Sequence, residues 1–244
     1  MPDSLALAFP VEQFLRSVFP CYCPRNESRN SRRWLDCAVS LERVGLDCDY
    51  LDRTSYSDAM TPNLKTWQPH FEEVEGRVNH FYLDGADIVT IGIGCQVFDL
   101  LTLTMFHKDG TVTASRSEIM SDYNAVKSMR AGAVPAVYGA VCRLLITESA
   151  IDQLFDARLM ACIREVELEG LDLENTPDSA VLAVVDMAFN LGTYGLISKF
   201  PKFINAFKNH DWHTCALECK REGIQASRNE WTREIFEALE GVVT

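Results

Sequence analysis

The stretch that decides the fold is Glu75–Gly94, which reads EGRVNHFYLDGADIVTIGIG. A carboxylate, Glu75, ends a short amphipathic segment, and an Asp84-Gly85 pair typical of a tight turn follows it. The strand after the turn carries the hydroxyl of Thr90. Two carboxylates on opposite sides of a turn, with a hydroxyl facing them, are the groups that hydrolysis of a glycosidic bond needs. One acid protonates the leaving oxygen, and one base activates water.

Two hairpins are predicted around this stretch. Residues 81–83 and 88–93 alternate in the manner of strands and join at the Asp84-Gly85 turn. Within the second strand, Gly92 and the following Gly94 leave room for close backbone approach. The run LTLTMFHK, an Asp-Gly pair at 109–110 and then TVTA form the strongest short hairpin signal in the chain.

The chain after residue 115 is expected to be helical. Ser115 or Ser117 is predicted to cap a helix over 118–129, and a second apolar helix face spans 135–145. Thr147 is predicted to cap a long helix whose apolar positions repeat with the α-helical period.

The end of the chain is predicted to hold a central buried helix and three shorter ones. Residues 178–191 (DSAVLAVVDMAFNL) are apolar nearly all round and close on Gly192, which favours a buried helix with a glycine stop. The last helix is predicted to open with a capping box of Ser227 and Glu230. Its predicted buried face consists of Trp231, Ile235 and Leu239.

Residues 1–60 look like a small helical appendage, and the two prolines of 54–69 mark the boundary after it. Four of its cysteines are spaced C-x-C-x13-C-x10-C, which lacks the paired knuckles of a zinc site, so idle thiols are the favoured reading. These cysteines are Cys21, Cys23, Cys37 and Cys48. We therefore predict no metal site and no cofactor.

Composition excludes several classes of protein. The 244 residues are 47% apolar and 24% charged, which is ordinary for a soluble globular protein. A net charge of −12 argues against nucleic-acid binding. There is no run of eighteen apolar residues and no basic N-terminal region, so neither a membrane span nor a signal peptide is expected. The nine cysteines are interpreted as reduced thiols.

The central stretch resembles the phage-type lysozymes of the T-even bacteriophage class. That family opens with a catalytic Glu-Gly, then an aromatic residue, an Asp and Thr-Ile-Gly-x-Gly. Here Glu75-Gly76, Tyr82, Asp84 and the run 90–94 stand at the same spacing without a gap. Downstream, residues 186–192 (DMAFNLG) look like the family's buried helix. The resemblance covers roughly residues 66–240.

The resemblance implies an α+β, mostly helical protein with a lysozyme-like fold. Residues 66–244 would form the catalytic domain, and residues 1–60 an N-terminal helical appendage of unknown role. Within the domain we expect a small β-hairpin lobe over 66–146, a connecting helix over 147–170 and a helical lobe over 171–244.

The resemblance also assigns roles to three residues. Glu75 would be the general acid, kept protonated by an apolar setting, and Asp84 would be the ionised base that holds the attacking water. Thr90 would anchor the same water. The reaction would be an inverting hydrolysis of the β-1,4 bond between N-acetylmuramic acid and N-acetylglucosamine in peptidoglycan. Inversion predicts that the two carboxyl groups lie roughly 6.5–9.5 Å apart.

Three further residues receive supporting roles from the resemblance. Tyr82 and Asn190 would contact the sugar, and Arg228 would support the acid structurally. Cys95 stands where family members commonly have His, so any ion pair made by that His is missing.

The appendage, the acidic balance and the lack of a signal peptide look more like an antibacterial effector of type VI secretion than a free endolysin. Such a protein would be a monomeric toxin made in the cytoplasm. It would act on the cell wall in the periplasm of a target bacterium after delivery. Possible partners are an immunity protein and a secretion carrier.

Other readings remain open at this stage. Each of Glu75, Asp84 and Thr90, taken alone, has an ordinary structural explanation as a surface acid, a turn residue and a strand residue. A lysozyme-fold protein that binds wall glycan or a partner without cleaving is one alternative, and a chitin hydrolase of the same fold is another. A third places the function in residues 1–60 as a docking module.

Overall fold

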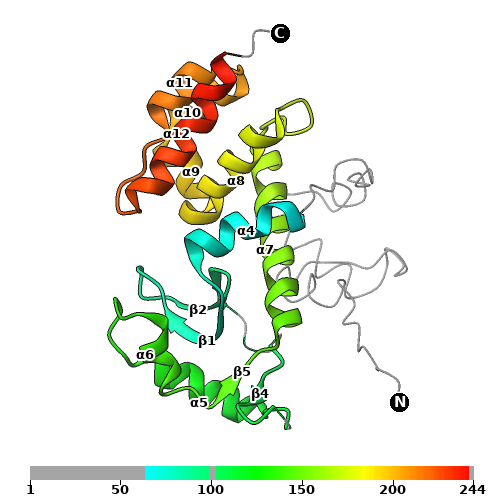
Figure 1. The fold of residues 1–244 in the computed structure, drawn as a ribbon, viewed down its shortest axis with the longest axis vertical. Coiled ribbons are helices and arrows are strands. Elements are labelled where there is room, and N and C mark those ends of the chain that lie inside the picture. Colours follow the sequence, from blue (N-terminus) through cyan, green and yellow to red (C-terminus); the bar gives the residue numbers. More distant parts are fainter. Residues whose placement is uncertain (1–63, 99, 101–102, 111, 242–244) are drawn as a thin grey trace, which may run out of the picture. The chain divides into compact units, whose positions relative to one another are not determined.

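The computed structural model describes residues 64–98, 100, 103–110 and 112–241. They form an α+β, mostly helical structure, as predicted (Figure 1). In chain order the elements are α4 (Leu64–Glu75), β1 (Val78–Leu83), β2 (Val89–Gly92), β3 (Cys95–Gln96), β4 (Phe106–His107), α5 (Arg116–Lys127), α6 (Pro135–Gly139), β5 (Leu144–Leu145), α7 (Glu148–Leu168), α8 (Asp178–Leu191), α9 (Thr193–Lys199), α10 (Pro201–Lys208), α11 (Trp212–Glu218) and α12 (Ala226–Glu240). The predicted appendage and its four cysteines lie outside the described residues.

The chain divides into two compact units, and each is described by itself. The first holds residues 78–151, and the second holds the described residues 64–77 together with 152–241. The sequence analysis grouped residues 66–77 with the small lobe, whereas α4 belongs to the second unit. The physical reason is burial, because Phe71 of α4 packs against the rings of Phe155 and Phe189 at 5.3 and 4.9 Å.

The first unit is built on a three-stranded antiparallel sheet in the order β1-β2-β3. Helices α5 and α6 pack against β1. The β1–β2 hairpin is confirmed, with Tyr82 opposite Thr90. Its turn is longer than the predicted Asp-Gly pair, because the left-handed position falls on Asp87, with φ 64°, three residues after Asp84. An Asp side chain tolerates this conformation better than most.

The Gly-x-Gly segment makes a second turn instead of continuing the strand. Gly92 and Gly94 have φ values of 68° and 62°, which favour glycine. Strand β2 therefore ends at Gly92, and β3 returns with Cys95 opposite Ile91. The expectation that residue 93 continues the strand was wrong, and the two glycines serve to reverse the chain.

The second predicted hairpin forms only in part. His107 donates its backbone N–H to Val112 at 3.0 Å, and Phe106 makes an isolated bridge with Thr113. The strand that pairs with β4 is β5, far along the chain, which the sequence analysis placed inside a helix over 135–145. The buried carboxylate of Asp122 accepts the backbone N–H groups of residues 143 and 144 at 2.6 and 2.9 Å. These groups are therefore unavailable to a helix, which ends at Gly139.

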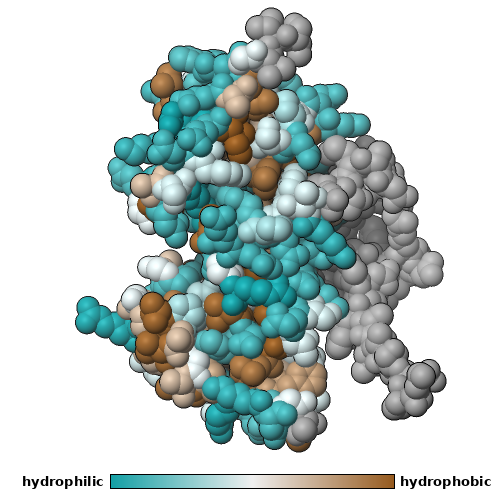
Figure 2. Space-filling model, in the orientation of Figure 1, coloured by the Kyte–Doolittle hydropathy of each residue, from teal (hydrophilic) through white to brown (hydrophobic). Residues whose placement is uncertain are grey.

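Capping in the first unit follows the sequence. Ser115 accepts the N–H of Glu118, and the Glu118 carboxylate accepts the N–H of Ser115, so the predicted N-cap becomes a complete capping box on α5. Thr147 likewise accepts the N–H of Ala150 at the start of α7. Around α6 the side chains of Val134, Val137 and Val141 are exposed, and Figure 2 shows apolar surface on this part of the unit.

In the second unit, helices α4 and α8–α12 pack together with the part of α7 that begins at residue 152. The predicted central helix α8 has the bounds expected from the sequence and is buried over most of its length. Phe203, Phe207 and Phe236 form an aromatic cluster between α10 and α12. The short helix α9 was not predicted. It follows directly after Gly192, whose φ of 72° ends α8.

The last helix differs from its prediction. Helix α12 begins after Gln225, which makes no side-chain cap, so the predicted capping box of Ser227 and Glu230 is wrong. The buried positions are Arg228, Thr232 and Phe236, while Trp231, Ile235 and Leu239 are half-buried. The helix is rotated relative to the prediction because its buried face carries an arginine, which a hydrophobicity pattern does not recognise.

Among the described residues, no single helix is long and apolar enough to cross a membrane. Helices α8 and α9 meet the length and composition criteria only when taken together, across a bend of 102°.

Candidate functional site

Glu75 lies at the end of α4, in the second unit. Its Oε1 accepts a hydrogen bond from Nη1 of Arg228 at 2.7 Å, and 21% of its side chain is exposed. Its Oε2 has no partner among the described residues. Gly76, with φ 77°, ends the helix directly after the carboxyl group. The surroundings of this carboxyl are therefore not purely apolar, because the guanidinium of Arg228, which the resemblance gave a supporting role, bonds its Oε1.

Arg228 joins Glu75 to a second carboxylate, Asp186 of α8. Nη2 of Arg228 donates to Oδ1 of Asp186 at 2.7 Å, and Nε lies 3.1 and 3.2 Å from the two carboxylate oxygens. The side chain of Asp186 is 0% exposed and that of Arg228 is 3% exposed. One guanidinium thus bridges a fully buried carboxylate and a partly exposed one.

Arg221 contacts the other side of Asp186. Its Nη1 donates to Oδ2 of Asp186 at 2.9 Å, and its Nη2 donates to Oγ1 of Thr232 at 2.8 Å. Asn229 bonds the backbone N–H and C=O of Arg221, which holds this loop residue against α12. Arg221 is itself fully buried, so this charge is paired within the core.

His70 completes the cluster from α4. Its Nε2 lies 3.0 Å from Oδ1 of Asp186. Because an ionised carboxylate can only accept, Nε2 carries the proton. The His70 ring also stacks on Trp231 of α12, with centroids 3.8 Å apart. We call His70, Glu75, Asp186, Arg221 and Arg228 the charge cluster.

Within the charge cluster, the surroundings shift the pKa values of Asp186, Arg221 and Arg228. Burial raises the pKa of Asp186, but hydrogen bonds from His70 and Arg228 and the charges of both arginines outweigh it and lower this pKa to about 2. Burial lowers the pKa of Arg221. For Arg228 burial acts in the same direction, but Asp186 and Glu75 outweigh it and raise the pKa. Two guanidinium groups therefore face two carboxyl groups.

Asp84 lies in the first unit, in the turn after β1. Its Oδ1 accepts the backbone N–H groups of Ala86 and Ile88, both at 2.9 Å. Its Oδ2 accepts from Nε2 of Gln96 at 3.1 Å. The carboxylate therefore organises its own turn, and three donors determine its orientation.

Thr90 lies in the middle of the same sheet. Tyr82 of β1 and Gln96 of β3 are its cross-strand neighbours, and directly opposite residues share a face. The Thr90 side chain is 1% exposed, and its hydroxyl donates to the carbonyl of Ile88 at 3.1 Å. Tyr82 is buried as well. The structure thus brings Asp84, Tyr82 and Thr90 together in the first unit.

Asn190 lies near the end of α8 in the second unit. Its Oδ1 is buried and has no hydrogen-bond partner among the described residues. A buried amide oxygen without a partner costs free energy, so this atom is a candidate acceptor for a ligand or a water. The predicted roles of Tyr82 and Asn190 in sugar binding stay predictions.

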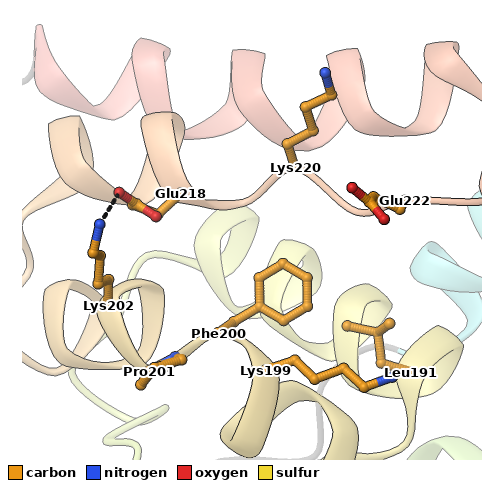
Figure 3. A pocket seen from close by; sticks show the side chains of 8 residues that line it. All are labelled: Leu191, Lys199, Phe200, Pro201, Lys202, Glu218, Lys220 and Glu222. Atoms are coloured by element: carbon orange, nitrogen blue, oxygen red, sulfur yellow. Dashed lines mark hydrogen bonds and ion pairs between the residues drawn. The ribbon is translucent and has the colours of Figure 1, made fainter.

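A pocket of about 550 Å³ is present in the second unit (Figure 3). Phe200 points into it, and Lys202 and Glu218 form an ion pair at 3.3 Å on its rim. The residues that line it are Leu191, Lys199, Phe200, Pro201, Lys202, Glu218, Lys220 and Glu222. None of them is a predicted site residue, so the predicted chemistry does not use this pocket.

Gln96 and three members of the charge cluster, His70, Asp186 and Arg221, were not predicted from the sequence. One signal was present for Asp186, since a charged residue in the middle of an apolar helix must find a partner in the core. Arg221 lies in a loop beside other charged residues and carries no such signal. Gln96 follows Cys95 in a short return strand and is recognisable only once that strand is paired.

Neither the family models nor the curated proteins that were compared with this chain match it.

Proposed function

We propose that the protein is a peptidoglycan muramidase with a lysozyme-like fold. It hydrolyses the β-1,4 bond between N-acetylmuramic acid and N-acetylglucosamine with inversion. The observation that carries the proposal is the state of Glu75. One oxygen is held by a buried arginine, while the other has no partner among the described residues on a partly exposed side chain. The spacing of Glu75, Asp84 and Thr90 in the chain supports the same function.

Glu75 acts as the general acid. The hydrogen bond from Arg228 orients the carboxyl group through Oε1, which leaves Oε2 to carry the proton toward the leaving sugar oxygen. A fixed orientation matters because a proton donor must lie within hydrogen-bond reach of the oxygen that it protonates.

Asp84 acts as the general base. Three donors orient its carboxylate, and the Gln96 amide is the single side chain among them. A water held by Asp84 attacks the anomeric carbon from the face opposite the leaving group, which is what inversion requires. Thr90 contributes to this water only if its hydroxyl turns away from the carbonyl of Ile88.

A protein of this function serves as a wall-lysing toxin or endolysin that acts on the wall of a target bacterium. Its partners are peptidoglycan strands, and a toxin of this kind also requires a secretion carrier and an immunity protein.

A second candidate is a lysozyme-fold module that binds wall glycan without cleaving it. The specific observation that favours it is the burial of Thr90, whose hydroxyl is used within its own strand. In this reading Asp84 only organises its turn.

The test is turbidity loss of purified peptidoglycan, with product masses determined. Wild type should clear the suspension, and Glu75→Ala and Asp84→Asn should each lose roughly 10²-fold or more in rate. The matched control is Glu73→Gln, an exposed acid two residues before Glu75 on the same helix, which should retain the wild-type rate.

The products separate the candidates. Products that end in a reducing N-acetylmuramic acid support the muramidase, and anhydro-sugar products exclude the water-activating role of Asp84. Cleavage of chito-oligosaccharides in preference to peptidoglycan would indicate a chitin hydrolase. If folded wild type binds peptidoglycan without clearing it, the binding module is the correct function.

A further inference from the structure

The charge cluster is larger than the support of one acid requires. Asp186 and Arg221 are both 0% exposed in the core of the second unit. The free energy needed to remove two charges from water is about as large as the free energy gained from their attraction. A buried ion pair is therefore weak evidence that the pair stabilises the fold. An apolar pair of similar volume would serve the core at least as well. The arrangement therefore points to a role beyond holding α8 and α12 together.

The geometry of Arg228 connects the buried part of the cluster to Glu75. Nε and Nη2 of Arg228 are bound by Asp186, and Nη1 is bound by Glu75. A guanidinium is planar and rigid, so fixing two of its nitrogens fixes the position of the third. Asp186 thus determines where Nη1 meets the carboxyl group of Glu75.

We propose that Asp186 is a positioning residue for the catalytic acid, acting on Glu75 through Arg228. This inference rests on the proposed function, because it takes Glu75 to be the acid. Asp186 orients the guanidinium and also supplies the negative charge that balances it. Arg221 and His70 hold Asp186 in turn, through Oδ2 and Oδ1.

The charge balance predicts the direction in which the pH dependence of activity should move when Asp186 is replaced. With Asp186 replaced by an amide, two guanidinium groups face Glu75 alone. A stronger positive potential favours the ionised form of a neighbouring carboxyl, so the acid would lose its proton at lower pH. The alkaline limb of the activity profile should therefore move to lower pH. A role limited to packing would lower the amount of folded enzyme and leave the limb in place.

The remaining titratable groups nearby do not disturb this reading. The thiols of Cys162 on α7 and Cys219 after α11 are neutral, because burial raises the pKa of both, to about 12 for Cys162. Glu72, on the same helix as Glu75, is paired with Arg77 at 2.7 Å. His70 contacts Asp186 through Nε2 and is present unchanged in wild type and in every variant compared.

The experiment measures kcat and KM on soluble peptidoglycan fragments from pH 4 to 9 for wild type and Asp186→Asn. We expect kcat to fall about tenfold or more with little change in KM. We expect the alkaline limb to move down by roughly one pH unit, as a unit charge several ångströms away produces at an effective dielectric constant near 20. The matched control is Thr232→Val, which removes the acceptor of Arg221 from the same buried cluster without changing any charge.

A second variant keeps the test sound if Asp186→Asn does not fold. Arg221→Gln removes a positive charge on the far side of Asp186 and should move the alkaline limb to higher pH, the opposite direction. Limbs that stay in place in an active enzyme, or a limb that moves as far in Thr232→Val, would overturn the inference and leave the muramidase intact. A folded wild type without activity at any pH would overturn the proposed function itself, and the positioning role with it.

Discussion

At the scale of single residues, Arg228 is the side chain that links the proposed catalytic acid to the buried charges behind it. It bonds Glu75 with one nitrogen and Asp186 with the other two. A Lys in its place would present a point charge and could not fix both carboxyl groups in one plane. The motif therefore identifies an acid, and the side chain that orients it comes from a helix 153 positions further along the chain.

Because folding lowers the pKa of Asp186, we expect the unfolding free energy of the protein to decrease at low pH. In the folded protein the hydrogen bonds of Asp186 and the charges of both arginines lower this pKa to about 2, from an ordinary value of 3.8. The contribution of this carboxylate is therefore present above about pH 4 and is lost as the pH falls toward 2. The difference corresponds to about 2 kcal/mol. Asp186→Asn should flatten the pH dependence of the unfolding free energy between pH 4.5 and 2.5, measured by urea denaturation.

Glu234→Gln is the control for this measurement. Glu234 is an exposed acid on α12, so its amide variant should keep the wild-type slope. An unchanged slope in Asp186→Asn would mean that folding does not lower the pKa of Asp186.

At the scale of elements, local sequence predicts the start of α5 correctly and the start of α12 incorrectly. The capping box at Ser115 forms because both of its partners lie within three residues on α5. The same Ser-x-x-Glu pattern at Ser227 does not cap α12, which starts at Ala226 with Ser227 already inside its first turn. The start of α12 follows instead from the burial of Arg228 and Thr232.

These two serines form a matched pair for a stability measurement. Ser115→Ala should cost about 1 kcal/mol, because the N–H of Glu118 loses its acceptor. Ser227→Ala should change stability by less than about 0.5 kcal/mol, as expected for an exposed residue without a capping role. Chemical denaturation of both variants gives the comparison. Equal losses would show that Ser227 caps α12 after all.

At the scale of the whole molecule, the chain buries its apolar side chains in two separate groups. In the second unit, Phe71 brings α4 onto α7 and α8 through Phe155 and Phe189. In the first unit, Phe81 and Val89 lie in the sheet, and α5 and α6 cover β1. Within the described residues, the chain passes from the second unit to the first after residue 77 and returns after residue 151.

Phe71→Ala tests this division. Phe71 is fully buried, and its truncation should destabilise the second unit by about 3–5 kcal/mol. Hydrogen exchange should show lost protection for the amides of α8 and retained protection for those of β1 and β2. Tyr194→Ala, at an 85% exposed position of the same unit, is the control and should leave both sets unchanged. Equal loss of protection in β1 and β2 would contradict the division into two units.

The sequence predicted the presence and type of most helices and strands correctly, but it misplaced several of their ends. Helix α8 and the β1–β2 hairpin were recognised because periodicity and turn residues act over a few positions. The strand β5 was missed because its backbone partners, Asp122 and β4, lie tens of residues away. The same limit applies to the site, where Glu75, Asp84 and Thr90 are visible as a local motif and Gln96 is visible only in a paired sheet.

The sequence by itself determined which segments are helices and strands and which carboxyl groups stand at a suggestive spacing. Both depend on local chemistry, namely the alternation of apolar residues, the dihedral preferences of turns and the reach of a capping side chain. Only the tertiary structure decided that Asp186, Arg221 and His70 join Arg228 and Glu75 in one cluster. Their pairing depends on desolvation, since a charge buried by helix packing must find a partner wherever in the chain that partner lies.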